Sequence, residues 1–240
     1  MSLSHTRRVI PMSEWLLIYE GYDPEQVGLR EALCTTGNGV FATRGSAPEC
    51  RADGVHYPGT YRIGLYDRQE TTIEGTTVPN ESVVNLPNWL HCRFRVEDGA
   101  WFTPDGADLL EYEQRFDMRE GLYSRHFRFR HGDKVTAVTQ RRFVSMADPH
   151  AAAMETTFKA ENWSGTLVVE SGIDGRVENA GVERYGQLES RHLETLEARE
   201  LDGESLLLQA RTLQSRIRIA EAVRSCVHRR ERRHPREPRH

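Results

Sequence analysis

Short runs in which apolar and polar residues alternate fill the chain from its middle toward its end. In residues 123–130, Phe127 and Phe129 fall on one face and polar side chains fall on the other. The four residues that follow are turn-forming, and residues 135–145 are again rich in Val, Thr and Phe. This period of two residues predicts a β-hairpin with one face in solvent.

Two more hairpins are predicted further along the chain. Residues 153–160 and 166–170 are separated by Asn, Trp, Ser and Gly, and we expect them to form a second pair of strands. Residues 194–200 and 205–211 are joined through an Asp-Gly dipeptide, which is a strong signal for a tight hairpin turn.

One further strand is predicted over residues 216–223, where Ile217, Ile219 and Glu221 share a face. Short strands at this spacing, with turn residues between them, are typical of a β-sandwich or a β-barrel. An unpaired edge at this last strand would invite pairing with another chain, so we expect the protein to associate.

Helical signals are scarce and are confined to residues 24–33. Asp23 can cap a helix, Pro24 fits the first helical position, and Glu25 suits the positive end of the helix dipole. One or two short helices are therefore expected in a chain that is otherwise all-β and mainly antiparallel.

Glycine and asparagine gather in one short run, GNGVFATRG at residues 37–45. Its glycines demand positive φ angles or very close approach of neighbouring atoms, and its apolar residues indicate a turn bounded by strands. The run lacks the Gly-Lys-Ser/Thr ending and the spacing of phosphate-binding loops. We expect a structural turn in which Asn38 and Gly39 have positive φ, while Arg44 reaches a neighbouring loop or domain.

A second dense stretch, VNLPNW at residues 84–89, combines amide and aromatic side chains. Indole rings and amide groups are suited to binding sugars, so one interpretation is a sugar-binding surface. The competing interpretation places Trp89 in the core or in a seam between domains. The candidate substrate-binding or interdomain residues are Asn38, Arg44, Tyr61, Asn85, Asn88 and Trp89.

No catalytic constellation is predicted. The acidic residues between positions 111 and 120 are interpreted as a solvated surface or linker, because nothing marks one of them as a buried acid. Histidines are scattered, no Gly-x-Ser-x-Gly motif occurs, and no cysteine or histidine has metal-ligand spacing.

Composition describes an ordinary soluble domain of 240 residues, with 38% hydrophobic and 28% charged residues. A formal charge of −4 gives no sign of a nucleic-acid or membrane partner, and no apolar run approaches the length of a spanning helix. The four cysteines are expected to be buried or half-buried free thiols, which favours a cytoplasmic location.

Several short motifs follow one another along the chain in a recognisable order. They are WLLIYEGYDP from Trp15, REAL from Arg30, the run at 37–45, YPGTY from Tyr57, VNLPNW from Val84, SGIDG from Ser171 and RHL from Arg191. Over residues 15–219 the chain resembles the N-terminal domain of family 65 glycoside hydrolases. That family includes inverting phosphorylases of maltose, trehalose, kojibiose and related α-glucosides, together with acid trehalases.

The resemblance implies a large β-sandwich of the super-sandwich, galactose mutarotase-like type that packs on an (α/α)6 catalytic barrel. Because the family's general acid and phosphate site lie in that barrel, the chain is expected to be non-catalytic. The resemblance also implies α-glucose disaccharides as substrates of the parent enzyme, inorganic phosphate as its co-substrate, no metal or organic cofactor, and support for a homodimer. The parent could be a hydrolase instead, and the chain itself could be a stand-alone carbohydrate-binding module or a structural or interaction domain without ligand.

Three segments are expected along the chain. Residues 1–14 are an N-terminal arm, residues 15–223 are the sandwich, and residues 224–240 are a basic, disordered tail with two prolines. Because the resemblance stops where the tail begins, we expect the chain to be truncated, or its reading frame disturbed, near residue 224.

Overall fold

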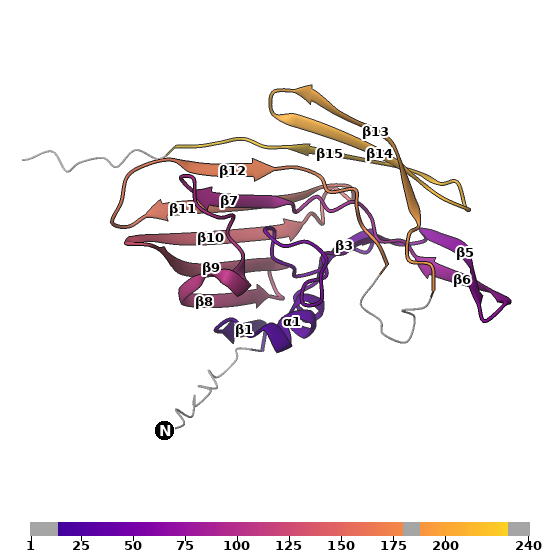
Figure 1. Cartoon of the computed structure of the whole chain (residues 1–240), viewed down its shortest axis with the longest axis horizontal. Coiled ribbons are helices and arrows are strands. Elements are labelled where there is room, and N and C mark those ends of the chain that lie inside the picture. Colours follow the sequence, from indigo (N-terminus) through magenta and orange to yellow (C-terminus); the bar gives the residue numbers. More distant parts are fainter. Residues whose placement is uncertain (1–13, 180–187, 230–240) are drawn as a thin grey trace, which may run out of the picture.

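The computed structural model describes residues 14–179 and 188–229, and Figure 1 shows them as stacked layers of strands with little helix. The helices are η1 (Pro24–Gln26), α1 (Val27–Leu33) and η2 (Pro104–Gly106). The strands of the first half are β1 (Leu16–Glu20), β2 (Thr36–Gly37), β3 (Phe41–Thr43), β4 (Thr60–Arg62), β5 (Tyr66–Ile73), β6 (Thr76–Val83) and β7 (Cys92–Val96). Those of the second half are β8 (Asp108–Asp117), β9 (Leu122–His131), β10 (Lys134–Val144), β11 (Ala152–Ala160), β12 (Leu167–Ser171), β13 (Leu193–Asp202), β14 (Ser205–Thr212) and β15 (Arg218–Arg224).

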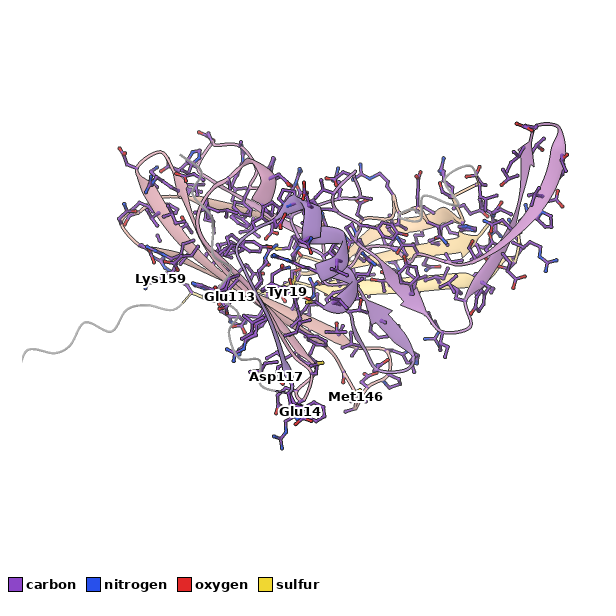
Figure 2. The ribbon with its side chains drawn as sticks, turned by 90° about the horizontal axis from the view of Figure 1, so that it is seen from below. Glu14, Tyr19, Glu113, Asp117, Met146 and Lys159 are labelled. Carbon is purple, nitrogen blue, oxygen red and sulfur yellow. The ribbon has the colours of Figure 1, made fainter. Side chains whose placement is uncertain are left out.

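The largest sheet has five antiparallel strands in the order β1-β8-β9-β10-β11. Its outer face is polar, as the projecting side chains of Glu113, Asp117 and Lys159 illustrate in Figure 2. On that face Arg128 pairs with two glutamates from neighbouring elements, Glu111 and Glu161, at 2.6 Å each. The predicted wet face of the 123–145 hairpin is therefore confirmed.

The inner face of this sheet carries the main core, which is largely aromatic. Phe94 and Phe102 stack on Phe127 and make tilted contacts with Phe129, and the ring centroids of the Phe94–Phe102 pair lie 4.8 Å apart. Phe94 belongs to β7, which pairs with β12 in a second layer. Phenylalanines on facing strands thus join the two layers of a sandwich.

Three smaller sheets complete the described residues: β2-β3-β4, the hairpin β5-β6, and the antiparallel sheet β13-β14-β15. A second apolar cluster of Leu65, Val84 and Leu86 packs against Leu193 and Ile219, so it ties the β13-β14-β15 sheet to the loops beside β5 and β6. The all-β, mainly antiparallel architecture with short helices is therefore confirmed. None of the described helices is long and apolar enough to cross a membrane.

The 37–45 run is a turn between β2 and β3, as predicted, but its glycines serve different purposes. Gly39 has a φ of +82°, whereas Asn38 does not share the positive φ expected of it. Instead the Asn38 side-chain oxygen accepts hydrogen bonds from the amides of Val40 and Phe41, which closes the turn. At Gly45 an added Cβ would lie 2.6 Å from the Cys34 Cβ, so the close approach of α1 requires glycine there.

Two sequence predictions about strands were wrong. Residues 153–160 and 166–170 do not pair: β11 joins β10, and β12 crosses to the other layer and joins β7. The acidic stretch at 111–120 is not a linker, because most of it lies in β8, where Tyr112 and Gln114 are buried between exposed charged residues. The expectation of an exposed surface holds for Glu111 and Glu120.

The predicted arm at residues 1–14 and tail at residues 224–240 fall mostly outside the described residues. Strand β15 continues to Arg224, one residue past the expected end of the sandwich. All four cysteines are free, and Cys34, Cys50 and Cys92 are buried, whereas Cys226 is exposed.

Candidate functional site

Arg44 is held inside the domain by its neighbours in sequence and space. Its Nε donates to the Tyr57 carbonyl at 2.9 Å, and its Nη2 donates to the Gly28 carbonyl at 3.2 Å and lies 3.5 Å from a Glu31 carboxylate oxygen. Its guanidinium also lies over the Tyr57 ring, 5.2 Å from the centroid. The neighbouring loop that Arg44 was predicted to reach is therefore part of this chain.

Tyr61 and Asn85 meet Arg44 at the same corner of the fold. The Tyr61 hydroxyl donates to the Tyr57 hydroxyl at 2.9 Å, and the Tyr57 hydroxyl donates to the Glu178 carbonyl at 3.2 Å. Asn85 accepts from the Thr60 amide at 3.0 Å and donates to the Glu178 carbonyl at 3.1 Å. Burial, followed by the Tyr57 hydroxyl, raises the pKa of Tyr61, so its hydroxyl stays neutral.

The remaining predicted residues lie elsewhere. Asn38 donates to the carbonyls of Ser145 (2.7 Å) and Pro149 (3.2 Å), so it anchors the turn to the end of β10. Asn88 accepts from the Leu90 amide, and its backbone bridges to Asp174. Because each of these amides bonds to backbone, their geometry favours a structural role for them.

Trp89 differs from the asparagines that flank it. Its side chain is half-buried, and its indole Nε1 is shielded from solvent without a hydrogen-bond partner among the described residues. A buried indole N–H ordinarily finds an acceptor. This unmet donor keeps Trp89 a candidate for contact with a ligand or with another domain.

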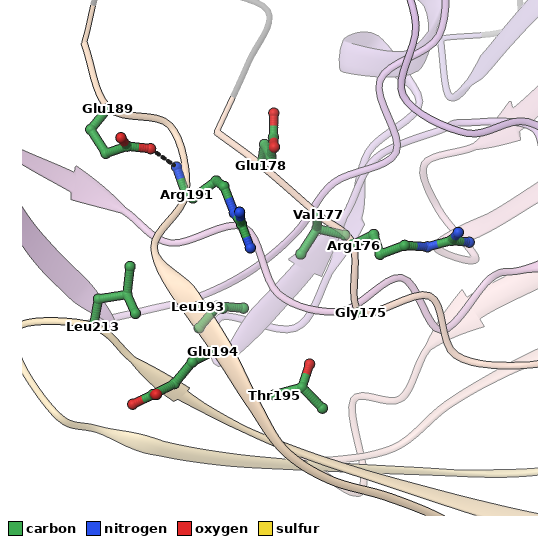
Figure 3. Close-up of a pocket in the computed structure, with 10 residues that line it drawn as sticks. All are labelled: Gly175, Arg176, Val177, Glu178, Glu189, Arg191, Leu193, Glu194, Thr195 and Leu213. Atoms are coloured by element: carbon green, nitrogen blue, oxygen red, sulfur yellow. Dashed lines mark hydrogen bonds between the residues drawn. The ribbon is translucent and has the colours of Figure 1, made fainter.

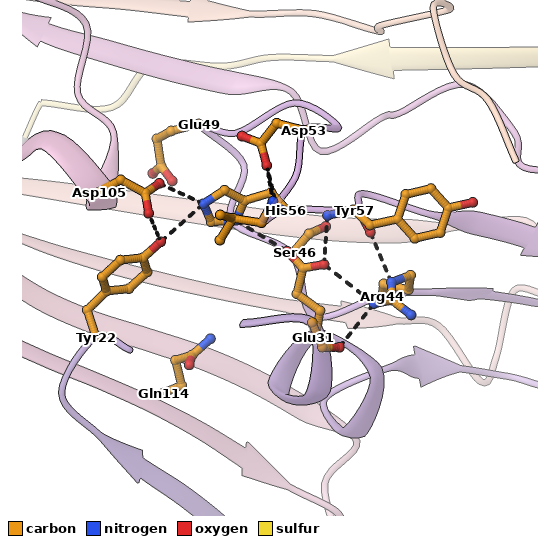
Figure 4. Close-up of polar contacts among 12 residues, drawn as sticks. Tyr22, Glu31, Arg44, Ser46, Glu49, Asp53, His56, Tyr57, Asp105 and Gln114 are labelled. Carbon is orange, nitrogen blue, oxygen red and sulfur yellow. Dashed lines mark hydrogen bonds and ion pairs between the residues drawn. The ribbon is translucent and has the colours of Figure 1, made fainter. Parts of the chain in front are cut away.

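Sequence reasoning missed a charged network centred on His56, which Figure 4 shows between η2, α1 and the loop that precedes β4. His56 Nε2 lies 3.0 Å from an Asp105 oxygen, and His56 Nδ1 lies 3.4 Å from a Glu31 oxygen. The Tyr22 hydroxyl donates to Asp105 at 2.5 Å. The partners are far apart in sequence, and no local motif signals them.

The network fixes the charge of His56. Burial alone would lower the pKa of this histidine, but hydrogen bonds to Cys50, Glu31 and Asp105 raise it to about 11. The imidazole is therefore protonated at neutral pH and lies between two carboxylates. A histidine in that state cannot serve as a general base at neutral pH, and it is better suited to holding elements together.

A second buried charge lies under the segment that follows Arg44. Arg125 Nη2 donates to Glu49 at 2.5 Å, and Gln140 donates to the other Glu49 oxygen at 2.7 Å. Arg142, equally buried, donates to the carbonyls of Ser46 and Arg44. These contacts from β9 and β10 hold residues 44–49 against the inner face of the large sheet.

One hollow of about 790 Å³ lies beside β13, and Figure 3 shows the residues around it. Its lining consists of Gly175, Arg176, Val177, Glu178, Glu189, Arg191, Leu193, Glu194, Thr195 and Leu213. Charges of both signs surround an apolar floor, but Arg176 is already bound to Asp174 at 2.9 Å, and Glu194 to Arg211 at 2.6 Å. None of the predicted site residues lines this hollow.

No group of three or more His, Cys, Asp or Glu side chains within residues 14–179 and 188–229 could hold a metal ion. The acidic residues of β8 have ordinary surface roles, as the Arg128 pair of Glu111 shows. A carboxyl with a strongly raised pKa does exist, at Glu221 on β15, where burial raises it to about 8.

The chain has relatives both in sequence and in structure. Residues 17–240 match the sequence model of the glycosyl hydrolase family 65 N-terminal domain. An uncharacterized glycosyl hydrolase of Mycobacterium tuberculosis is 50% identical over 214 residues, which cover 89% of this chain and 16% of that protein. A kojibiose phosphorylase of Thermoanaerobacter brockii is 28% identical over 221 residues, which cover 92% of this chain and 27% of the phosphorylase.

The fold has a counterpart among solved structures. A candidate kojibiose phosphorylase from the human microbiome superimposes with a TM-score of 0.73 at 18% sequence identity, over 88% of this chain and 27% of that one. The chain thus spans between about a sixth and a quarter of the length of these relatives.

Proposed function

The chain belongs to glycosyl hydrolase family 65 as an N-terminal domain of that family, and from this premise we propose that it is the non-catalytic front domain of a larger sugar-cleaving enzyme. The observation that carries the proposal is the family match over residues 17–240, combined with the small share of each relative that the chain covers. The domain would pack on an (α/α)6 catalytic barrel.

The side chains of the described residues support a non-catalytic role. An inverting glycosidase needs two carboxyl groups about 6.5–9.5 Å apart across the scissile bond, or one carboxyl and a phosphate site in a phosphorylase. Here the buried carboxylates Glu31, Glu49 and Asp67 are all engaged with cations or amides of this chain. Their interactions position loops, so none of these three acids is free to act as a proton donor.

The parent reaction that we propose is reversible phosphorolysis of an α-linked glucose disaccharide with inversion. Relatives named as kojibiose phosphorylase and trehalose 6-phosphate phosphorylase support this class of reaction. Inorganic phosphate would be the co-substrate, and neither a metal nor an organic cofactor is needed. We also propose a cytoplasmic location, supported by the four free cysteines, and a homodimeric parent enzyme.

We propose the corner of Arg44, Tyr61 and Asn85 as part of the seam with the barrel. There the side chains of Tyr57 and of the buried Asn85 both donate to the Glu178 carbonyl, so they brace a segment that lines the hollow next to β13. Such pre-positioned loops are what shaping the rim of an active site requires.

The decisive assay measures phosphate-dependent release of glucose 1-phosphate from maltose, trehalose and kojibiose by this chain. We expect no release, because the acid and the phosphate site belong to the barrel. Measurable turnover would overturn the proposal that this domain is non-catalytic.

A second function, a carbohydrate-binding module, is favoured by one observation: the buried Trp89 Nε1 has no partner among the described residues. Calorimetric titration with the same three disaccharides distinguishes the two functions. Heat of binding that disappears in Trp89→Ala and persists in Trp101→Ala would support the module. If none of the three sugars gives a heat of binding, the carbohydrate-binding module is ruled out and the surface is assigned to the seam with the barrel.

A further inference from the structure

Strand β15 (Arg218–Arg224) is an edge strand that pairs only with β14 among the described residues. Its side chains alternate, so that Ile219, Glu221 and Val223 are half-buried and the residues between them are exposed. The middle of the three inward positions is thus occupied by a carboxylic acid. Every other inward residue of this strand is aliphatic.

The Glu221 carboxyl group has no partner. Both of its oxygens are shielded from solvent, and neither accepts a hydrogen bond from any described residue. Leu208 lies opposite it on β14. The neighbouring Ile219 packs against the apolar cluster of Leu65, Val84 and Leu86 on the facing loops.

The inward neighbours of Glu221 on β15 and its opposite residue on β14 are aliphatic. The charged side chains nearest to Leu208 in the facing segment, Asp174 and Arg176, flank Gly175 and are paired with each other at 2.9 Å. Burial raises the pKa of Glu221 from 4.5 to about 8, and no charged group among the described residues adds to or opposes that effect. An ionised carboxylate without a donor is costly to bury, so the group keeps its proton.

We propose that Glu221 is held as a neutral carboxylic acid in the folded domain, and that deprotonation loosens β15 from the sandwich, so that the exposure of this edge is set by pH. The closed position of the strand over the facing loops is favoured while its central side chain is uncharged. As pH rises, opening of β15 lets the carboxylate ionise in water. The domain therefore carries a pH-sensitive strand at the edge of the β13-β14-β15 sheet.

The direction and range of the effect follow from proton linkage. Below pH 4.5 the carboxyl is protonated whether β15 is closed or open, so the opening equilibrium of β15 is independent of pH. Between pH 4.5 and about 8 only the open strand has lost the proton, and the opening equilibrium constant rises about tenfold for each pH unit. Above about pH 8 both states are ionised and the dependence ends.

Amide hydrogen exchange of β15, followed between pH 5.5 and 7.5, tests the proposal. The rate of amide exchange through local opening rises about tenfold per pH unit because exchange is base-catalysed. Loss of the Glu221 proton on opening raises the opening equilibrium constant by about another tenfold per unit. We expect a roughly hundredfold rise per unit in the native chain. In Glu221→Gln and Glu221→Met the exchange rate should rise only tenfold per pH unit. This slope does not depend on how well either new side chain packs.

A matched control comes from the same sheet. Glu200 is an exposed glutamate of β13, so Glu200→Gln makes the same chemical change without touching a buried carboxyl. This variant should retain the hundredfold rise. A tenfold rise for β15 in the native chain, or an unchanged hundredfold rise in both Glu221 variants, would overturn the proposal, because either result means that Glu221 does not carry the linked proton.

Discussion

At the scale of single residues, buried ion pairs hold loops of the domain in place. Arg125 and Glu49 are 1% and 0% exposed, and they join β9 to the segment that follows the 37–45 run. Burial alone would lower the pKa of Arg125, but the charge of Glu49, the nearby Tyr112 and Tyr123 and the hydrogen bond to Glu49 together outweigh it, so the net shift is upward and the pair stays ionised. Removing one member leaves the other charged without a partner.

Arg125→Met should therefore lower the free energy of unfolding by about 3–5 kcal/mol, the range for an orphaned buried charge. Arg141→Met is the matched control, because Arg141 makes a comparable 2.5 Å contact with Glu155 on the exposed face. The control should cost less than about 1 kcal/mol. Urea unfolding measures both, and equal losses would show that burial of the Arg125 pair does not matter.

His56 predicts a dependence of stability on pH. Its folded pKa, about 11, lies above the ordinary value of 6.5, so its contribution is complete below pH 6.5 and decreases as the pH rises toward 11. The stability advantage of the native chain over His56→Gln should shrink by about 1 kcal/mol for each unit between pH 7 and 9. Thermal unfolding of both proteins at several pH values measures this, and a constant difference would contradict the protonated state.

Some of these residues could be read from the sequence and others could not. The Asp23 cap, whose oxygen accepts from the Glu25 amide, and the positive φ of Gly39 follow from local chemistry. The contact of His56 with Asp105 joins positions 49 residues apart, and no spacing rule connects them. For the predicted site, the structure brings Arg44, Tyr61 and Asn85 together, a grouping that depends on the fold and not on any local pattern.

At the scale of elements, the sequence predicts hairpins well because both strands and their turn are local. The strands β9 and β10, and likewise β13 and β14, pair as expected. The β7–β12 pair was missed because its members are distant in sequence and the turn-like residues after β11 suggested a local partner. Strand β8 was missed because charged residues on its outer face obscured the buried Tyr112 and Gln114.

The packing of α1 against the turn after β3 gives a test at this scale. Gly45→Ala would bring a Cβ to 2.6 Å from the Cys34 Cβ and 3.1 Å from the Glu31 carbonyl oxygen, so we expect a loss of about 1–3 kcal/mol. Gly28→Ala, in α1 with nothing within 4 Å, should instead raise stability by up to about 1 kcal/mol. Thermal unfolding compares the two, and a neutral Gly45→Ala would show that α1 can shift away.

At the scale of the whole molecule, open sheet edges dominate the expected behaviour in solution. Within residues 14–179 and 188–229, β15 has one partner strand and so does β12, and their ends meet where the Ser171 and Ser225 hydroxyls lie 2.8 Å apart. Val169 of β12 is 45% exposed although it lies on the same face as Phe94, its partner in β7. Open strand edges of this kind readily form hydrogen bonds with strands of other chains, and exposed apolar side chains add to that contact.

We therefore expect the chain to associate as its concentration rises, which light scattering would detect. Ala222→Lys places a charge on the exposed side of β15 and should reduce association several-fold. Thr139→Lys adds the same charge on the exposed face of β10, an interior strand of the large sheet, and should leave association unchanged. A clean monomer at high concentration would contradict the expectation.

The β7–β12 pair also has a consequence for the order in which the protein is made. Phe94 pairs with Val169, so β7 leaves the ribosome about 75 residues before its partner exists. At about 5–20 residues per second, the backbone edge of β7 waits several seconds for β12, whereas Phe127 and Phe129, which cover its aromatic face, are made after about 33 residues. During synthesis β7 therefore presents a hydrogen-bonding edge after its side chains have found their partners, and this edge is where we expect a chaperone to bind.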